Sequence, residues 1–344
     1  ARQSWAETVG GGGNSVAAPS HSMRLWRTKI EAFRSSRPLD GSGWSNVAMQ
    51  SALWISRVDM ANGGCATMCG MFAFSANLST LFADRPFPER FAAARVAGFE
   101  AVECQFPYDW EADQLAAQLR AQGQKMVLHN LPAGNWAAGE RGIACHPDRL
   151  DEFRAGVECA IRYARTLGVT QLNCLAGVLP EGIDPREAEE TLCANLCHAA
   201  RTLSAHGLRL LVEPINPIDV PRFFLDRPSR AFALVAELRE RHGLDNLLVQ
   251  FDIYHAQRTE GELAATLQRW LPLIGHVQVA DNPGRAEPGS GEIRFPFLFD
   301  WLERIGYRGY VGCEYFPADK GDRGTEAGLA WLAGHGRTAG GRHS

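Results

Sequence analysis

The sequence lacks the features that mark several large functional classes. None of its apolar runs is long enough to cross a bilayer. Basic residues are not in excess, because 35 Lys and Arg stand against 39 Asp and Glu, which gives a net charge of -4 and a pI near 6.2. A nucleic-acid binder usually carries a basic face. We therefore expect neither a membrane span nor a nucleic-acid partner.

Paired sets of metal-binding cysteines are also lacking. The nine cysteines include two close pairs, Cys65 with Cys69 and Cys193 with Cys197, but neither has a second pair at zinc-ligand spacing. A shared helix face explains Cys193 and Cys197 more simply. Free thiols of this kind indicate a reducing compartment, so we expect a cytoplasmic protein.

Residues 1–69 lack any sustained hydrophobic period of 2 or 3.6. They contain a glycine run and scattered Ser, Arg and Trp, without the compact apolar segment of a secretory signal. The stretch is expected to be a low-order, disordered extension. A transit peptide is one alternative, and a segment translated from too early a start, before Met68 or Met71, is another. Residues 70–336 are expected to form the catalytic domain and 337–344 a flexible tail.

From residue 71 onward, short apolar runs alternate with longer amphipathic ones. Eight runs have the composition of buried parallel strands. They are Phe72–Asn77, Ala101–Gln105, Lys125–Asn130, Gln171–Leu175, Arg209–Glu213, Leu247–Asp252, His276–Ala280 and Tyr310–Tyr315. Eight helix-like segments follow them: Pro88–Ala97, Trp110–Gln122, Pro147–Leu167, Pro185–His206, Pro228–His242, Glu260–Trp270, Pro296–Ile305 and Gly324–Leu332. Several begin with proline and end on glycine, as helices commonly do.

This alternation predicts an α/β fold, a closed (β/α)8 TIM barrel. The alternative is an open doubly wound sheet, which would need a glycine-rich phosphate loop directly after its first strand. The chain has Ser75 to Ser79 there, with no glycine. The barrel is therefore favoured.

Four consecutive strands end in a polar side chain: Glu213, Asp252, Gln278 and Glu314. In such a barrel the carboxyl ends of the strands form the catalytic face. A buried structural ion pair would explain any one of these residues alone. Three carboxylates that converge would repel each other and lose hydration, and a hard divalent cation with oxygen ligands resolves that conflict. The set predicts a Mg²⁺ or Mn²⁺ site in which Gln278 uses its amide oxygen. The absence of Cys or several His ligands argues against a closed zinc site.

Other polar residues near the strand ends are candidates for binding a substrate. His255, three residues after Asp252, is expected to hydrogen-bond a substrate rather than to bind the metal. His129 and Asn130 end the third strand and could also face a substrate, although a satisfied core histidine is an equal alternative for His129. Arg285 lies in a loop rich in Pro and Gly, where it could clamp a carboxylate or remain a solvated surface residue.

At these motifs the chain resembles the hydroxypyruvate isomerase family, within the xylose-isomerase-like barrels that also include sugar epimerases and endonuclease IV. The matching pieces are Phe74–Ser79, Gly98–Glu103, Leu211–Asn216, Gly275–Ala280, Pro283–Pro288 and Gly309–Tyr315. The match extends from about residue 72 to about residue 334 and leaves residues 1–70 unmatched.

The resemblance implies that Glu213 and Glu314 are the two catalytic glutamates. It also implies a divalent metal held by Glu213, Asp252, Gln278 and Glu314, and proton transfer that interconverts hydroxypyruvate and tartronate semialdehyde. Related sugar epimerases carry a His where this chain has Gln278, which favours the hydroxypyruvate branch. The expected partner is a small hydroxy-carbonyl acid, and a homo-oligomer is left open.

Four alternatives follow from the same motifs. A 2-oxo-tetronate isomerase shares nearly all of them. A 3-epimerase that acts on a neutral ketose would use the same chemistry, but its substrate would not need a cation such as Arg285. A DNA-repair barrel would show several more metal-binding histidines. A barrel that serves only as an interaction scaffold would not need the complete four-strand ligand set.

Overall fold

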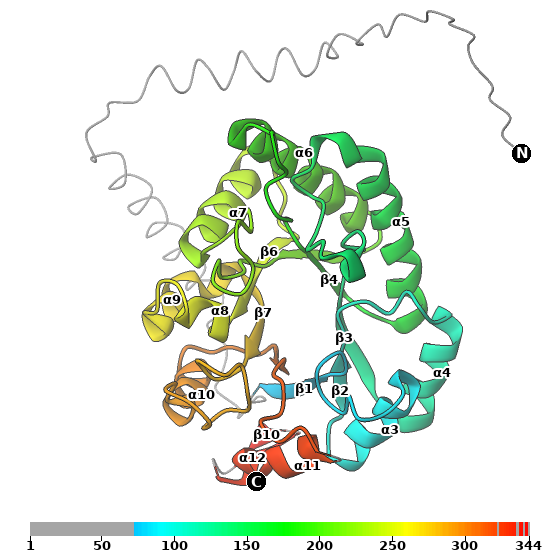
Figure 1. Ribbon diagram of the computed structural model, residues 1–344, viewed down its shortest axis with the longest axis vertical. Helices are drawn as coiled ribbons and strands as arrows, with labels where there is room; N and C mark the ends of the chain where they lie inside the picture. The colour runs from blue at the N-terminus through cyan, green and yellow to red at the C-terminus, as the bar shows by residue number, and fades with distance from the viewer. Residues whose placement is uncertain (1–71, 322, 335–336, 340, 343–344) are drawn as a thin grey trace, which may run out of the picture. The chain divides into compact units, whose positions relative to one another are not determined.

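Eight parallel strands form a closed barrel in the computed structural model, which describes residues 72–321, 323–334, 337–339 and 341–342. The strands are β1 Ala73–Asn77, β2 Ala101–Glu103, β3 Lys125–Asn130, β4 Gln171–Cys174, β5 Arg209–Val212, β6 Leu247–Asp252, β7 Ile274–Val279 and β8 Tyr310–Cys313. Each strand pairs with the next in sequence, and β8 closes the ring against β1 through Ala73 opposite Tyr310. Figure 1 looks into this ring, with the helices arranged around it.

Helices surround the barrel, most of them between successive strands and the last two after β8. They are α3 Phe87–Val96, α4 Ala112–Gln122, α5 Leu150–Leu167, α6 Pro185–Ser204, α7 Pro228–His242, α8 Ile253–Gln257, α9 Leu263–Trp270, α10 Phe295–Arg304, α11 Gly324–Gly328 and α12 Ala330–Gly334. The helices α4, α5 and α7 each end on a glycine with positive φ, which only glycine adopts without a steric cost. In the described part of the chain, no helix has the length and apolar composition of a membrane span.

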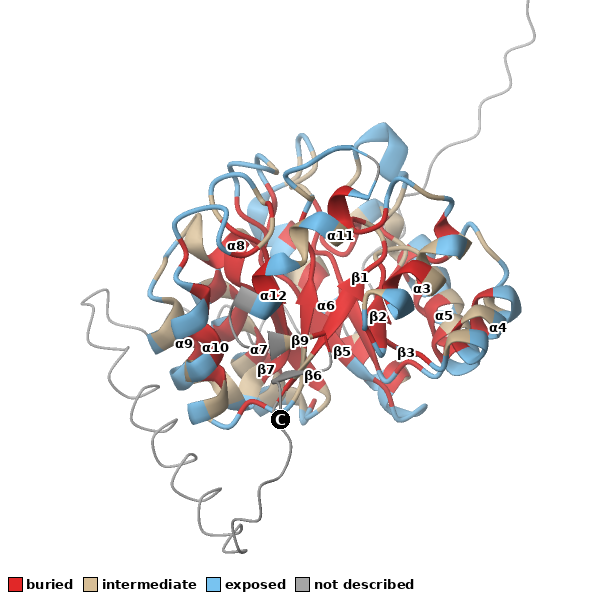
Figure 2. Ribbon diagram, turned by 90° about the horizontal axis from the view of Figure 1, so that it is seen from below, coloured by how far each residue is buried: buried red, intermediate tan, exposed pale blue. Residues whose placement is uncertain are grey.

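The barrel interior changes from apolar to polar along the strands. Side chains alternate between the two faces of a strand, so Leu248, Gln250 and Asp252 of β6 share the interior face. A small apolar cluster fills one end of the interior, and it comprises Ala101, Val127, Leu128, Leu211 and Leu248, with Tyr310 against it. A much larger cluster packs the strands against the helices, and Figure 2 shows the buried strands inside an exposed outer surface. Buried polar groups therefore gather beyond the apolar end, where the strands finish.

The structure confirms the predicted (β/α)8 barrel. The bounds of β3, β6 and α7 agree with the sequence-based ranges, and most of the others shift by one to three residues. The helices differ from the prediction in two places. The short helix α8 was not predicted, and the last predicted helix is divided into α11 and α12.

The predicted terminal segments have different outcomes. Residues 1–69 and the cysteine pair within them lie outside the described residues. In the predicted tail, β9 Arg337–Thr338 pairs with β10 Gly341–Arg342, and the buried Ala339 accepts a hydrogen bond from the backbone N–H of Phe74. The flexibility of the tail and the domain boundaries stay predictions.

Candidate active site

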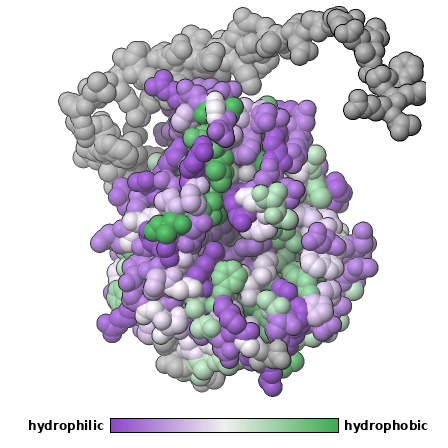
Figure 3. All heavy atoms as spheres, in the orientation of Figure 1, coloured by the Kyte–Doolittle hydropathy of each residue, from purple (hydrophilic) through white to green (hydrophobic). Residues whose placement is uncertain are grey.

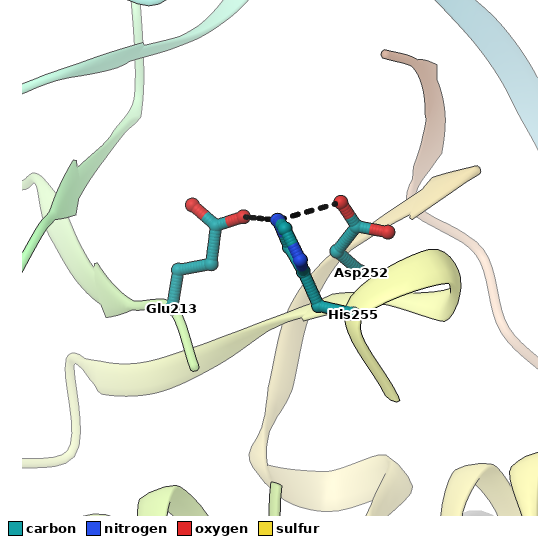
Figure 4. Close-up of side chains that lie close together, drawn as sticks. All are labelled: Glu213, Asp252 and His255. Atoms are coloured by element: carbon teal, nitrogen blue, oxygen red, sulfur yellow. Dashed lines mark ion pairs between the residues drawn. The ribbon is translucent and has the colours of Figure 1, made fainter. Parts of the chain in front are cut away.

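Three carboxylates from three strands lie buried at the polar end of the barrel. Glu213 directly follows β5, Asp252 ends β6 and Glu314 directly follows β8, and each is at most 4% exposed. His255, on α8, places its Nε2 3.9 Å from Glu213 Oε1 and 3.6 Å from Asp252 Oδ2. Figure 4 shows the imidazole ring between the two carboxylates. Both distances are too long for a direct hydrogen bond, so a space separates these groups.

The electrostatics of this group reflect burial and mutual repulsion. Burial raises the pKa of Glu213 well above its ordinary value, and the charges of Glu314 and Asp252 add to the effect. Burial also raises the pKa of Glu314, and it raises the pKa of Asp252 to about 7. In contrast, burial lowers the pKa of His255 well below its ordinary value, and the nearby Arg285 contributes. The carboxylates are thus destabilised as anions while His255 is held neutral.

The donor set fits a hard divalent cation. Asp252 Oδ2 is buried, and none of the described residues donates a hydrogen bond to it. Burying a carboxylate oxygen without a partner costs free energy unless another group interacts with it. Ligand atoms of Glu213, Asp252 and His255 also lie within 4.8 Å of one another. A cation at this point would satisfy Asp252 and offset the repulsion between the carboxylates.

Glu213 is held in place by an asparagine that sequence analysis missed. Asn173, the third residue of β4, donates from Nδ2 to Glu213 Oε2 at 2.8 Å and to Asn130 Oδ1 at 3.2 Å. The structure therefore brings the predicted Asn130 into the network of Glu213. Asn173 is a polar residue inside an apolar strand, the same signal that identified the four predicted ligands, but it lies before the strand end.

Glu314 is held by donors from three other loops or strands. Its Oε1 accepts hydrogen bonds from Asn77 Nδ2 at 3.0 Å and Gln105 Nε2 at 2.9 Å. Its Oε2 accepts one from Arg285 at 3.0 Å, and the same guanidinium nitrogen lies 3.9 Å from Asp252 Oδ2. Arg285 is therefore close to the predicted ligands rather than free on the surface, and the alternative of a solvated surface arginine is wrong.

Gln278 lies in a buried polar network below these carboxylates. Its Nε2 donates to Glu103 Oε1 at 2.8 Å, and its Oε1 accepts from Gln250 at 2.7 Å. An amide oxygen has two lone pairs, so the Gln250 contact leaves one available for a cation. The role of Gln278 as a metal ligand stays a prediction.

Glu103 is the second functional candidate that sequence analysis missed. It ends β2 and is fully buried. Its carboxylate accepts hydrogen bonds from Ser75, Asn77, Gln278 and His276, the last at 2.9 Å. Burial alone would raise the pKa of Glu103, but His276 and the hydrogen bonds outweigh it, so the pKa is lowered. Two signals in the sequence could have identified it: its position in the resembling motif Gly98–Glu103, and its place as a charged residue in the apolar run that forms β2.

His129 lies on a different face of β3 from Asn130, because successive side chains alternate. Its ring packs edge-on against Tyr108 at 5.8 Å, and its Nδ1 lies 3.1 Å from the carbonyl oxygen of Asn130. Burial lowers the pKa of His129 to about 4. This environment agrees with a core histidine, and a substrate contact by His129 stays a prediction.

The outer surface over the barrel agrees with a small polar site. Figure 3, in the orientation of Figure 1, shows a hollow near the centre of this face, with mostly hydrophilic residues around it and a strip of hydrophobic residues beside it. Exposed aromatic residues of the described chain include Trp136, which stacks with Arg141, and Phe316, which lies under Arg285. Arg141 thus contacts Trp136 on its own loop.

The fold and this site define a class of enzymes. A family model described as xylose isomerase-like TIM barrel matches residues 91–335, and the chain belongs to this family. Hydroxypyruvate isomerase of Escherichia coli is 49% identical over 262 residues, which cover 76% of this chain and 98% of that protein. The 2-oxo-tetronate isomerase of Cupriavidus necator is 43% identical and covers 75% of this chain and 96% of its own length. Within the class, the chain belongs to the hydroxypyruvate isomerase family.

A solved structure supports the same architecture. A crystal structure described as an AP endonuclease, family 2, from Brucella melitensis is 44% identical. It covers 77% of this chain and 99% of its own, with a TM-score of 0.72. The whole barrel is therefore shared with this relative.

Proposed function

We propose that the protein interconverts hydroxypyruvate and tartronate semialdehyde. One observation carries the proposal. Glu213 and Glu314 lie at the ends of strands β5 and β8; burial raises the pKa of both, and the charge of Glu314 raises the pKa of Glu213 further. Two carboxyl groups with raised pKa values can accept and return protons near neutral pH. The 49% identity to a hydroxypyruvate isomerase supports this choice of substrate.

We propose a Mg²⁺ or Mn²⁺ ion as the cofactor, held by Glu213, Asp252, Gln278 and Glu314. The support is the oxygen-only set of proposed ligands and the buried Oδ2 of Asp252, for which the described residues provide no hydrogen-bond partner. A bound ion of this kind would act as a Lewis acid and make the C3 proton of the substrate more acidic.

The two glutamates would then exchange protons with the substrate. One of them removes a proton from C3 while the C2 carbonyl becomes an enediol, and the other returns a proton to C2. The hydroxyl proton moves from O3 to O2, so the product carries its carbonyl at C3 and no atom is gained or lost. Asn173 orients Glu213, and Asn77 with Gln105 orients Glu314.

The substrate is a small acid, and its carboxylate needs a cation. Arg285 is the proposed partner, with His255, His129 and Asn130 as further substrate contacts. A guanidinium offers five N–H donors, so Arg285 can contact Glu314 and still bind a carboxylate. We further propose a cytoplasmic enzyme without a nucleic-acid partner, which works alone or as a homo-oligomer.

A second candidate is a 2-oxo-tetronate isomerase. The 43% identity to such an enzyme over 75% of the chain favours it over the ketose epimerases. Its substrate is also a small acid, so the same residues would serve.

A substrate screen separates these candidates. The purified full chain is stripped of metal, supplied with Mg²⁺ or Mn²⁺, and assayed with hydroxypyruvate, 2-oxo-tetronate and a free ketose. We expect the highest kcat/KM with hydroxypyruvate and a requirement for the ion. A higher kcat/KM with 2-oxo-tetronate would transfer the assignment to that acid, and activity on the ketose alone would refute the acid substrate.

A further inference from the structure

The side chain of Asn216 has only one possible orientation. Asn216 follows β5, is fully buried, and accepts the backbone N–H groups of Ile218 and Asp219 on its Oδ1, at 3.1 Å and 2.9 Å. Its Nδ2 faces Asp219 Oδ2 at 3.1 Å and Nδ1 of His255 at 2.7 Å. A flipped amide would place its NH₂ group against two N–H donors, so the hydrogen-bond network excludes it.

This orientation determines which nitrogen of His255 carries a proton. An amide NH₂ group only donates, so the Nδ1 that it contacts must act as the acceptor. A proton on Nδ1 would place two donors against each other at 2.7 Å. The ring proton therefore resides on Nε2, the atom that faces Glu213 and Asp252 in Figure 4.

We propose that Asn216 is a positioning residue that fixes His255 as the Nε2–H tautomer. His255 then presents an N–H donor to the site instead of a lone pair. A ring nitrogen that binds a metal must be free of its proton. Although its distances to Glu213 and Asp252 would suit a three-ligand metal group, His255 in this tautomer would not be a ligand of a bound metal and could donate to a substrate oxygen. The statements about the metal and the substrate rest on the proposed function, whereas the tautomer of His255 does not.

The tautomer can be measured in the wild-type protein without any variant. Histidine labelled with ¹⁵N is incorporated into the full chain, and two-bond ¹H–¹⁵N correlations are recorded on the metal-free protein, with His255→Gln used to assign the signal. We expect Nδ1 of His255 to show the shift of an unprotonated nitrogen and Nε2 that of a protonated one. The opposite pattern would overturn the proposal.

A double variant reverses the polarity of the contact. In Asn216→Asp combined with Asp219→Asn, residue 216 still accepts the two backbone N–H groups and still pairs with residue 219, but it now accepts from His255. We expect His255 to change to the Nδ1–H tautomer. The single variant Asp219→Asn is the matched control, because it retains the Asn216 amide and should retain the Nε2–H tautomer. An unchanged tautomer in a folded double variant would contradict the role of Asn216.

Metal and activity measurements complete the test. Electron spin-echo spectra of Mn²⁺ bound to the wild-type protein should lack the nitrogen modulation of a directly bound imidazole, and its presence would overturn the proposal. With hydroxypyruvate, kcat/KM of the double variant should fall about 10- to 100-fold, as is typical when a group that orients a site residue is changed. If wild-type protein does not turn over hydroxypyruvate, the proposed function fails, while the tautomer result stands by itself.

Discussion

The buried carboxylate of Glu103 offers a sharp test of the packing beneath the site. Replacing Glu103 with Ala removes the acceptor for Ser75, Asn77, Gln278 and His276, and each unpaired buried donor costs about 1–3 kcal/mol. We therefore expect Glu103→Ala to lower the free energy of unfolding by at least about 3 kcal/mol.

Glu103→Gln separates the effect of charge from that of volume. Gln retains an acceptor oxygen for the amide groups of Asn77 and Gln278, which can only donate, and its NH₂ group then faces Ser75 and His276. The charged acceptor is lost, so we expect the free energy of unfolding to fall by about 1–3 kcal/mol. Urea unfolding at pH 7, followed by tryptophan fluorescence, measures the loss. Glu100→Gln is the control, because Glu100 is 74% exposed in a 3.9 Å pair with Arg95 and should change stability by less than about 0.5 kcal/mol.

The pH dependence of this loss has a definite sign. The pKa of Glu103 is lower in the folded protein than in the unfolded chain, so its stabilisation is complete above the unfolded pKa of about 4.3. It disappears as the pH falls through the folded pKa. The difference in the free energy of unfolding between wild type and Glu103→Gln should therefore become smaller below about pH 4.3. Equal stability of Glu103→Gln and wild type at pH 7 would refute the account of this network.

Three further predictions concern the site itself. Gly312→Ala would place a Cβ against the Glu103 carboxylate, so we expect the free energy of unfolding to fall by about 1–3 kcal/mol and the midpoint of thermal unfolding to be lower. An unchanged midpoint would show that the carboxylate has room to move. Arg285→Ala should lower kcat/KM for hydroxypyruvate at least about tenfold, because a charge-assisted contact contributes about 1.5–3 kcal/mol, and retained activity would favour a neutral ketose substrate. Asp252→Asn should weaken Mn²⁺ binding at least about tenfold in calorimetry, since it removes an anionic ligand, and equal affinity would exclude Asp252 as a ligand.

The sequence predicted the barrel because each strand and helix shows its own pattern. The apolar runs of β3 and β6 and the proline start and glycine end of α7 depend only on neighbouring residues, and these elements were predicted to the residue. The helix α8 was missed because its five residues are too few for a hydrophobic period. Its N-cap is Asp252, whose Oδ1 accepts the N–H of Tyr254.

The candidate site was predictable only where a polar residue ends an apolar strand. That pattern identified Glu213, Asp252 and Glu314, which the structure brings together. Glu103 and Gln278 are 175 residues apart in the sequence. Their contact depends on how the barrel closes, so no local sequence pattern could predict it.

Deuterium exchange tests the central claim most directly. The full chain with bound Mn²⁺ is incubated with hydroxypyruvate in D₂O, and the tartronate semialdehyde formed is analysed by mass spectrometry and NMR. Proton transfer through Glu213 and Glu314 predicts solvent deuterium at C2 of the product, and it predicts that Glu213→Gln and Glu314→Gln each nearly abolish turnover while remaining folded. Product whose C2 carries only the hydrogen that was originally at C3 of the substrate would contradict this mechanism. Turnover at the wild-type rate by both variants would contradict it as well.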